Sequence, residues 1–289
     1  MVSVGKLQIN KMTALPKNIL RIDIFEKFLL IAQTCLAGRW VLMLIAIFGF
    51  VCGELAWGIN AYAEPESSNL RTLSDIYQQA AGSPIRTNED KRADATRKPV
   101  EFLQFAKVRP GMQVLDLATG NGYTTQLLAL VVGSTGTVWA QGDSQRPALI
   151  KRLADHPQSN IVPVIHPFED PIPDAAPKLD LITNIMNYHN GSYLSVARRA
   201  RLNQRLFKAL KSGGHLIVID HSTKTGTDIT TAKTLHRTDP TIVLDELQKA
   251  GFRLEQESNL LRNPSDPRNQ IYFDMEMPTD KFAFRFVKP

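Results

Sequence analysis

One stretch of the sequence constrains the fold more than any other. It is residues 114–125, Val-Leu-Asp-Leu-Ala-Thr-Gly-Asn-Gly-Tyr-Thr-Thr. A short apolar run ends near Asp116, two glycines follow, and helical apolar spacing then begins, which predicts a strand, a tight turn and a helix. Gly120 and Gly122 let a ligand approach the main chain, and the first turn of the helix directs free N–H groups toward it. The stretch therefore predicts a binding site that favours negative charge.

The spacing of the glycines narrows the choice of ligand. A dinucleotide-binding turn carries a third glycine three residues after Gly122, and Thr125 occupies that position. A nicotinamide-dependent oxidoreductase is therefore the weaker hypothesis. A tight turn that binds no cofactor is the simplest alternative.

Strand and helix patterns alternate through the rest of the chain. After the strand that ends at Asp116, apolar runs predict six more strands, at residues 137–140, 161–165, 179–183, 216–220, 252–257 and 282–287. A helix is predicted over residues 94–108. The alternation indicates an α/β class, a Rossmann-like, mostly parallel seven-stranded sheet with helices on both faces. Ligands of such sheets bind at the carboxyl ends of the strands, where Asp116 lies.

The turn resembles the first motif of the class I S-adenosylmethionine-dependent methyltransferases, an acidic residue followed by three alternating glycines. Asp116 takes the acidic position, and Gly120 and Gly122 take the last two glycine positions. Ala118 replaces the first glycine, and its methyl group bears on how closely the methionine end of the cofactor can lie.

Further segments extend the resemblance over about residues 70–289, which we expect to form one methyltransferase-like domain. Residues 210–214, Leu-Lys-Ser-Gly-Gly, are similar to the family's Leu-Lys-Pro-Gly-Gly. Five short motifs resemble those of a group of predicted, often exported methyltransferases: Arg97-Lys98-Pro99, Asn187-Tyr188-His189, Asp220-His221-Ser222, Thr234-Leu235-His236-Arg237 and Leu261-Arg262-Asn263-Pro264.

The resemblance implies S-adenosylmethionine as the cofactor and suggests which residues bind it. Asp143 would accept the ribose hydroxyls, although it comes about one residue later than the family's acid, and Gly142 departs from the pattern. Glu169 or Asp170 would bind the adenine amine. Ordinary turn positions remain the alternative for these three acids. The remaining cofactor-binding candidates lie in the glycine-rich turn: Asp116, Ala118, Gly120, Asn121 and Gly122.

The catalytic candidates follow from the chemistry of methyl transfer. A methyl sulfonium is already activated, so the protein mainly aligns the acceptor and excludes water. A general base helps if the acceptor must lose a proton, and histidine titrates near neutrality. His189 and His221 follow the fourth and fifth predicted strands on the cleft side, and Tyr188 precedes His189. We predict catalytic roles for these three residues, with a surface or structural role as the alternative.

No metal site is predicted. Both cysteines, Cys35 and Cys52, precede residue 64, so the rest of the chain has no thiol for a disulfide, a thiolate metal site or thiol catalysis. The other possible ligands are widely spaced and include no helical histidine pair: His189, His221, His236 and Asp220.

The distribution of charge bears on the partner. Of the net charge of +6, residues 1–63 contribute six Lys and Arg against three Asp and Glu, which leaves a surplus of three on residues 64–289. Arg198, Arg199 and Arg201 cluster, but we expect them on a solvated helix face. The balance predicts no nucleic-acid partner.

Residues 1–63 have the pattern of a targeting segment. Arg39 precedes an apolar run from Trp40 to Cys52, and Ala61-Tyr62-Ala63 offers the small residues that a signal peptidase requires. We expect cleavage after Ala63 and export to the periplasm. If the signal is not cleaved, residues 40–60 would anchor the protein in the membrane.

The sequence as a whole predicts methyl transfer from S-adenosylmethionine to an unidentified small-molecule acceptor. Export conflicts with this function, because the cofactor is made in the cytoplasm. Ala118 and Gly142 also depart from the cofactor pattern. The alternative is an exported, non-catalytic binding protein that retains the methyltransferase fold.

Overall fold

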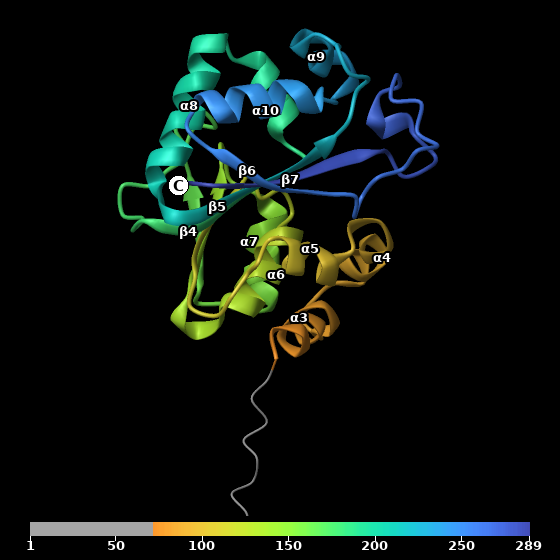
Figure 1. The fold of residues 1–289 in the computed structure, drawn as a ribbon. Helices are drawn as coiled ribbons and strands as arrows, with labels where there is room; N and C mark the ends of the chain where they lie inside the picture. Colours follow the sequence, from red (N-terminus) through yellow and green to blue (C-terminus); the bar gives the residue numbers. More distant parts are fainter. Residues whose placement is uncertain (1–71) are drawn as a thin grey trace, which may run out of the picture. The chain divides into compact units, whose positions relative to one another are not determined.

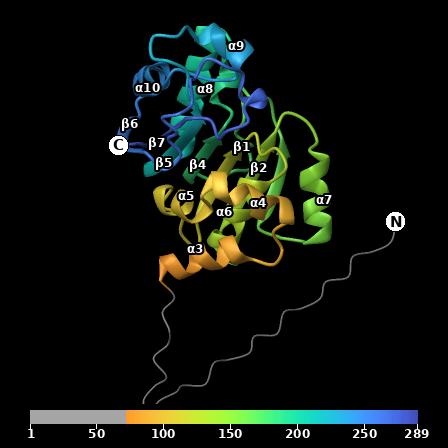
Figure 2. The same cartoon turned by 90° about the vertical axis from the view of Figure 1, so that its right-hand side faces the viewer.

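The computed structural model describes residues 72–289 (Figures 1 and 2). Residues 70–289 form a compact unit by themselves. The targeting segment predicted at residues 1–63, with its possible anchor at residues 40–60, lies outside the described residues. Within residues 72–289, no helix has both the length and the apolar character that a bilayer-spanning helix needs.

A seven-stranded sheet is the centre of this unit, with the strand order β3-β2-β1-β4-β5-β7-β6. The pairs among the first five strands of this order are parallel, and β7 runs antiparallel to both β5 and β6. The predicted α/β class and mostly parallel seven-stranded sheet are therefore confirmed. The strands are β1 (Gln113–Leu117), β2 (Thr137–Gly142), β3 (Ile161–Ile165), β4 (Leu179–Ile185), β5 (Leu210–His221), β6 (Arg253–Ser258) and β7 (Lys281–Val287).

Helices cover both faces of the sheet (Figure 1). Alternate residues of a strand point to opposite faces, so Val114 packs with one apolar cluster and Leu115 with the other. The first cluster includes α3 (Leu73–Gly82), α5 (Pro99–Phe105) and α6 (Tyr123–Val132), and the second includes α8 (Val196–Ala209) and α10 (Pro240–Lys249). The remaining helices of residues 72–289 are α4 (Asn88–Arg97), α7 (Pro147–Asp155) and α9 (Ala232–Leu235). Short 3-10 turns are η2 (Gly133–Thr135), η3 (Tyr188–Tyr193), η4 (Ile229–Thr231) and η5 (Tyr272–Asp274).

The single helix predicted over residues 94–108 is wrong. The structure has two helices there, because Lys98 takes a left-handed φ of 46° between the end of α4 and Pro99 at the start of α5. A proline disfavours the helical conformation of the residue before it and has no N–H to continue the helix. The break matters for function because Arg97, the last residue of α4, lines the cavity described below.

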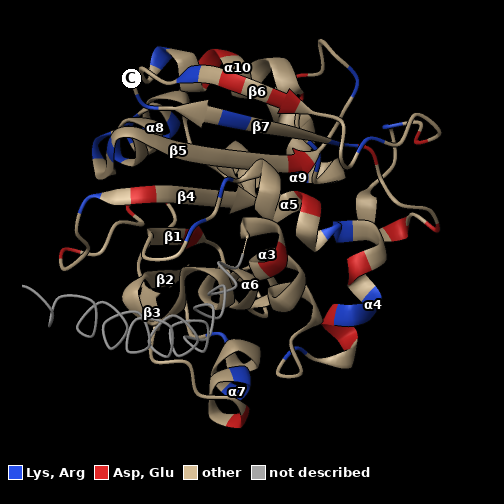
Figure 3. Ribbon diagram, turned by 60° about the horizontal axis from the view of Figure 1, so that its bottom comes forward, with Lys and Arg blue, Asp and Glu red and all other residues tan. Residues whose placement is uncertain are grey.

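The charged side chains form ion pairs rather than one basic surface. Figure 3 shows basic and acidic residues side by side along α4, whose sequence is NEDKRADATR. Contrary to the expectation from the sequence, the arginines of α8 do not all lie on a solvated face. Arg199 is buried, and it donates to Glu246 at 2.8 Å and to the carbonyl of Leu194 at 2.9 Å.

Candidate functional site

The glycine-rich turn connects β1 to α6, as the sequence predicts, and it contains several left-handed residues. Ala118, Gly120 and Gly122 have φ values of 50°, 56° and 85°. Gly122 is the N-cap of α6, and a Cβ there would lie 2.8 Å from Cδ1 of Leu149, so only glycine fits without movement. Ala118 also adopts a left-handed φ, although it carries a Cβ.

Asp116 is buried at the end of β1 and binds two hydroxyl groups. Thr125 on α6 and Thr183 on β4 each donate to its carboxylate at 2.7 Å. Burial raises the pKa of Asp116 to about 6, although both hydroxyl donors and the charge of Arg97 act in the opposite direction. The acidic residue of the motif therefore ties β1, α6 and β4 together at the base of the site.

Gln141, which the sequence analysis did not select, supports the turn from β2. Its side-chain oxygen accepts the N–H of Ala118 at 3.0 Å, and its carbonyl accepts the N–H of Thr119 at 3.0 Å. Its amide group donates to the carbonyl of His166 at 2.7 Å. The signal in the sequence was a glutamine directly after the predicted strand at residues 137–140. The family pattern has an acid near this position, so Asp143 was selected instead.

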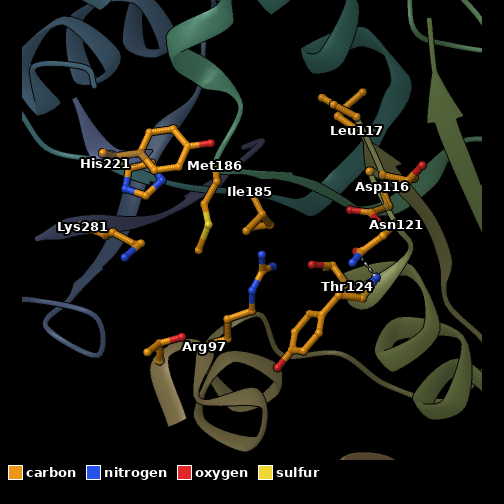
Figure 4. Close-up of a pocket in the computed structure, with 15 residues that line it drawn as sticks. Arg97, Asp116, Leu117, Asn121, Thr124, Ile185, Met186, His221 and Lys281 are labelled. Carbon is orange, nitrogen blue, oxygen red and sulfur yellow. Dashed lines mark hydrogen bonds between the residues drawn. The ribbon is translucent and has the colours of Figure 1, made fainter. Parts of the chain in front are cut away.

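A cavity of about 330 Å³ opens at the carboxyl ends of the central strands (Figure 4). Four of the five turn candidates line it, namely Asp116, Ala118, Gly120 and Asn121. Gly122 is not among the lining residues and caps α6 instead.

The opposite wall of the cavity comes from distant parts of the chain. Figure 4 shows His221 and Lys281 across the cavity from Asp116 and Asn121, with the guanidinium group of Arg97 directed into the space between them. The cavity therefore has one wall made by the turn and a second, polar wall made by the ends of β5 and β7.

The three acids predicted to bind the adenosine moiety are not brought into this cavity. The side chain of Asp143 is 60% exposed and pairs with Arg146 at 2.5 Å. Glu169 binds Arg198, and Asp170 binds Arg205 at 2.6 Å, both on α8. Their roles in binding ribose and adenine remain predictions.

His221 lines the cavity in an unusual environment. Its Nδ1 lies 2.6 Å from the hydroxyl of Thr279, its ring stacks on Tyr272 with centroids 4.1 Å apart, and its Nε2 is buried without a partner among the described residues. Burial lowers the pKa of His221 to about 3, against the opposing charge of Asp220. The ring is therefore neutral at physiological pH, whereas the sequence analysis assumed a base that titrates near neutrality.

His189 lies behind His221 and is oriented by a carboxylate. Its Nδ1 is 2.9 Å from Oδ1 of Asp220, and its main-chain N–H donates to Oδ2 at 2.7 Å. Burial alone would raise the pKa of Asp220, but the charge and hydrogen bonds of His189 hold it below its usual range. The ring of His189 lies 6.4 Å from that of His221 and 5.4 Å from that of His236. His189 is thus close to the cavity wall without being one of its lining residues.

Tyr188 points into the core that packs under α8 and α10. Its hydroxyl donates to Glu246 at 2.9 Å and accepts from Asn203 at 3.2 Å. Burial raises the pKa of Tyr188 well above its usual value. The structure does not bring this side chain to the cavity, and its catalytic role remains a prediction.

The sequence analysis did not select most of the other lining residues, and three of these lie on or near the second wall: Tyr272, Met186 and Lys281. Tyr272 and Met186 lie in segments without a readable pattern, and Met186 has a left-handed φ of 53°. Lys281 gave a signal, because it opens the otherwise mostly apolar strand Lys-Phe-Ala-Phe-Arg-Phe-Val. Its position opposite His221 in the β5–β7 register follows only from the pairing. In residues 72–289, no three His, Cys, Asp or Glu side chains are grouped so as to hold a metal ion.

Comparisons with known proteins identify the fold to which this architecture belongs. A family model described as protein-L-isoaspartate(D-aspartate) O-methyltransferase matches residues 77–150. A solved S-adenosylmethionine-dependent methyltransferase from Aquifex aeolicus aligns with 76% of this chain and 100% of its own, with a TM-score of 0.51 and 18% identity. The chain has the fold of the class I S-adenosylmethionine-dependent methyltransferases. The class I methyltransferase fold predicted from the turn between Asp116 and Gly122 is therefore confirmed.

Curated relatives extend the match beyond the family model. The ubiquinone/menaquinone biosynthesis C-methyltransferase UbiE of Ectopseudomonas mendocina is 27% identical over 161 residues, which are 55% of this chain and 61% of the relative. The protein of the same name from Burkholderia multivorans is 27% identical over 158 residues, 54% of this chain and 63% of the relative. The chain thus spans less than two thirds of each relative's length. The UbiE relatives are named as C-methyltransferases, whereas the family model is named as an O-methyltransferase. These names therefore do not identify the acceptor of this methyltransferase fold.

Proposed function

We propose that the protein transfers the methyl group of S-adenosylmethionine to a small-molecule acceptor. The observation that carries the proposal is the cavity of about 330 Å³, which joins the glycine-rich turn to a second polar wall at Lys281 and His221. One wall would bind the cofactor and the other the acceptor. The names of the UbiE relatives, C-methyltransferases of quinone biosynthesis, support a small organic acceptor.

The turn side of the cavity fits the amino-acid end of the cofactor. Thr119 has a buried hydroxyl without a partner among the described residues, and Gly120 leaves the approach to the main chain open. Arg97 offers a positive charge for a carboxylate. We assign these three residues and Asn121 to cofactor binding. When bound, the cofactor supplies an electrophilic methyl group attached to a sulfonium sulfur.

The rest of the cavity would position the acceptor and exclude water. Ile185, Met186 and Tyr272 supply apolar and aromatic surface, while His221 and Lys281 supply polar atoms. Alignment and exclusion of water are the main contributions that a protein makes to a reaction with an activated donor.

Calorimetry on the full chain tests cofactor binding. We expect S-adenosylmethionine and S-adenosylhomocysteine to bind and NAD not to bind. Gly120→Leu should abolish binding by filling the turn side of the cavity. Gly133→Leu is the matched control, because Gly133 also has a left-handed φ of 65° with nothing within 4 Å of an added Cβ, and it lies outside the cavity.

The same titrations separate the alternatives. A wild-type chain that binds neither form of the cofactor would refute the proposed function. Binding without turnover of a panel of small phenols, acids and amines would instead support the non-catalytic binding protein. Binding of NAD would favour the oxidoreductase hypothesis.

Export is a separate proposal that rests on the sequence of residues 1–63 alone. An alkaline phosphatase fused after Ala63 should be active if the segment directs export, and an inactive fusion would contradict it. Release of the untagged protein from the periplasm by osmotic shock would indicate cleavage after Ala63. Retention in the membrane fraction would indicate the anchor at residues 40–60.

A further inference from the structure

Lys281 is a buried cation without an acidic partner. It is only 6% exposed, and its Nζ donates to the carbonyl of Thr279 at 3.1 Å and to the hydroxyl of Thr279 at 2.8 Å. Among the described residues, no carboxylate forms an ion pair with it. Lysine is rarely buried to this degree unless it is paired, because loss of hydration disfavours the charge. Burial, with smaller contributions from Arg97 and Arg237, lowers the pKa of Lys281 to about 8, so most of the population stays protonated at pH 7.

The nearest carboxylates are already bound to other groups. Asp280 pairs with Arg262 at 3.3 Å and with Arg268 at 3.0 Å. Asp266 pairs with Arg237 at 2.7 Å. Their charges raise the pKa of Lys281 by less than burial lowers it. Folding therefore leaves a positive charge on the cavity wall that no side chain neutralises.

Asp220 is also close to this wall, and it too has its partners. It accepts the main-chain N–H of His221 at 2.8 Å as well as the ring and main-chain N–H groups of His189. Its carboxylate is therefore directed at the histidines.

His221 adds a second donor beside this charge. The hydroxyl of Thr279 accepts from Lys281, so it can give its own proton to Nδ1 of His221, 2.6 Å away. In this arrangement Nζ of Lys281 donates to the Thr279 hydroxyl, and that hydroxyl donates to Nδ1 of His221. The proton of the neutral imidazole ring is then on Nε2. That atom is buried, has no partner among the described residues, and belongs to a residue that lines the cavity. A neutral His221 then acts as a hydrogen-bond donor toward the cavity.

Aromatic and apolar groups surround the two donors. Tyr272 stacks on His221 with an angle of 10° between the ring planes, and Met186 and Ile185 lie between this wall and the turn (Figure 4). The donors lie across the cavity from Asp116 and Asn121, the side assigned to the cofactor. The wall thus combines a positive charge, a neutral donor and an aromatic surface.

We propose that the methyl acceptor is a small aromatic acid, whose ionised oxygen is bound by Nζ of Lys281 and Nε2–H of His221 while Tyr272 lies beside its ring. This substrate class rests on the proposed function, since it assigns one wall of the same cavity to the acceptor. A hydrogen bond from a positively charged donor favours the ionised form of the acid. His221 is in this respect a binding residue.

The test uses 4-nitrophenol, whose ionised form absorbs visible light, with the full chain saturated with S-adenosylhomocysteine. We expect the wild-type protein to bind the ionised probe and to lower its pKa by about one unit or more. Lys281→Met should weaken binding about tenfold or more, because it removes a charged donor. The affinity for S-adenosylhomocysteine should be the same in both proteins. Because 4-nitroanisole has the same ring but cannot ionise, it should not bind to the wild-type protein.

The control variant is Lys288→Met, at the other end of β7. Lys288 is also partly buried and donates to a main-chain carbonyl, that of Leu210 at 2.8 Å, but it lies outside the cavity. The Lys288→Met variant should bind 4-nitrophenol with the same affinity as the wild type. The comparison of the two probes on the wild-type protein needs no variant, so a poorly folding Lys281→Met would not prevent the test.

The proposal would be overturned by equal probe binding by Lys281→Met and wild type, by equal binding of 4-nitroanisole and 4-nitrophenol, or by no binding of 4-nitrophenol. Loss of S-adenosylhomocysteine binding in Lys281→Met would assign the lysine to the cofactor's own carboxylate and would also overturn it. Failure of the proposed function itself is distinguishable, because it appears as a wild-type protein that does not bind S-adenosylhomocysteine. In that case, titrations of 4-nitrophenol without cofactor, into wild type and Lys281→Met, still test whether Lys281 binds the ionised probe.

Discussion

The two walls of the cavity are built in different ways. In the glycine-rich turn, the lining residues lie within residues 116–124, and Asp116 binds Thr125 only nine residues away, although Thr183 on β4 also donates to it. In the opposite wall, His189 and Asp220 are 31 residues apart, and His221 and Thr279 are 58 residues apart. The first wall is a continuous stretch of sequence that could be recognised directly. The second exists only after β5 and β7 have paired.

Both walls contain a buried charge, but of opposite sign. Burial raises the pKa of Asp116 to about 6 and lowers the pKa of Lys281 to about 8, so each group is driven toward its neutral form. Asp116 receives two hydroxyl donors from the protein, whereas Lys281 receives no anion. The difference indicates that the carboxyl group of Asp116 serves the fold through its two hydrogen bonds, whereas Lys281 fits the role of binding an anionic ligand. The following predictions test this comparison.

The largest effect is expected from the buried ion pairs that support each wall. Arg237–Asp266, with both side chains 0% exposed, holds the loop that carries Tyr272. Arg152–Asp90 holds the turn, since Arg152 also donates to the carbonyl of Asn121 at 3.0 Å. Asp266→Ala or Asp90→Ala should each lower the free energy of unfolding by about 3–5 kcal/mol, because each leaves a buried guanidinium unpaired.

Urea unfolding checks these values, with Asp245→Ala as the control. Its pair with Lys249 is exposed on α10 and should contribute less than about 1 kcal/mol. Asp90→Ala should also weaken binding of S-adenosylhomocysteine more than Asp266→Ala does. The opposite order of binding would contradict the assignment of the two walls.

The second prediction concerns Lys281 in alkaline solution. Its pKa is lower in the folded protein than in the unfolded chain, so the unfolded chain binds more protons between about pH 8 and pH 10.5, and stability attributable to Lys281 rises with pH in this window. Lys281→Met removes this contribution. The difference in unfolding free energy between wild type and variant should change by about 3 kcal/mol across the window. A pH-independent difference would show that Lys281 is not buried as a cation.

Asp116 should show the opposite slope in acid. Its pKa is raised in the folded state, so the folded protein binds more protons between about pH 4 and pH 6, and the stability attributable to Asp116 falls as the pH rises through this window. Relative to Asp116→Asn, the wild type should lose about 3 kcal/mol between these limits. Chemical unfolding at several pH values measures it. If the difference instead favours the wild type at higher pH, the carboxylate is stabilised as an anion by the two threonines.

The smallest effect is expected from the turn glycines. Gly122→Ala places a methyl group 2.8 Å from Leu149 and 3.3 Å from Arg152, in addition to the strain of a left-handed φ. It should lower the free energy of unfolding by about 1–3 kcal/mol. Gly133→Ala introduces the strain alone and should cost about 1 kcal/mol. Equal losses would mean that Leu149 and Arg152 move aside and that the turn adapts to the added methyl group.

Much of the fold could be predicted from local patterns, and the failures have local causes as well. Apolar runs and glycine turns were enough to predict the seven strands. The helix over residues 94–108 was wrong in its bounds. The apolar positions on which it was based all follow Pro99, and the proline forces Lys98 out of the helical conformation, which separates α4 from α5. Asp143 was selected as a ribose-binding acid, yet it faces Arg146 three residues later, a pairing available within the loop itself.

The candidate site was predictable only on the side that the sequence encodes continuously. Asp116 to Gly122 determine a strand, a left-handed turn and a helix start, because glycine and an anchored acid act over a few residues. Tertiary structure alone decided the other side. It paired His221 with Lys281 across two antiparallel strands, placed Tyr272 on His221, and directed Tyr188 into the core. Strand pairing and burial set which side chains meet and which lose their hydration, and neither property belongs to any short stretch of the chain.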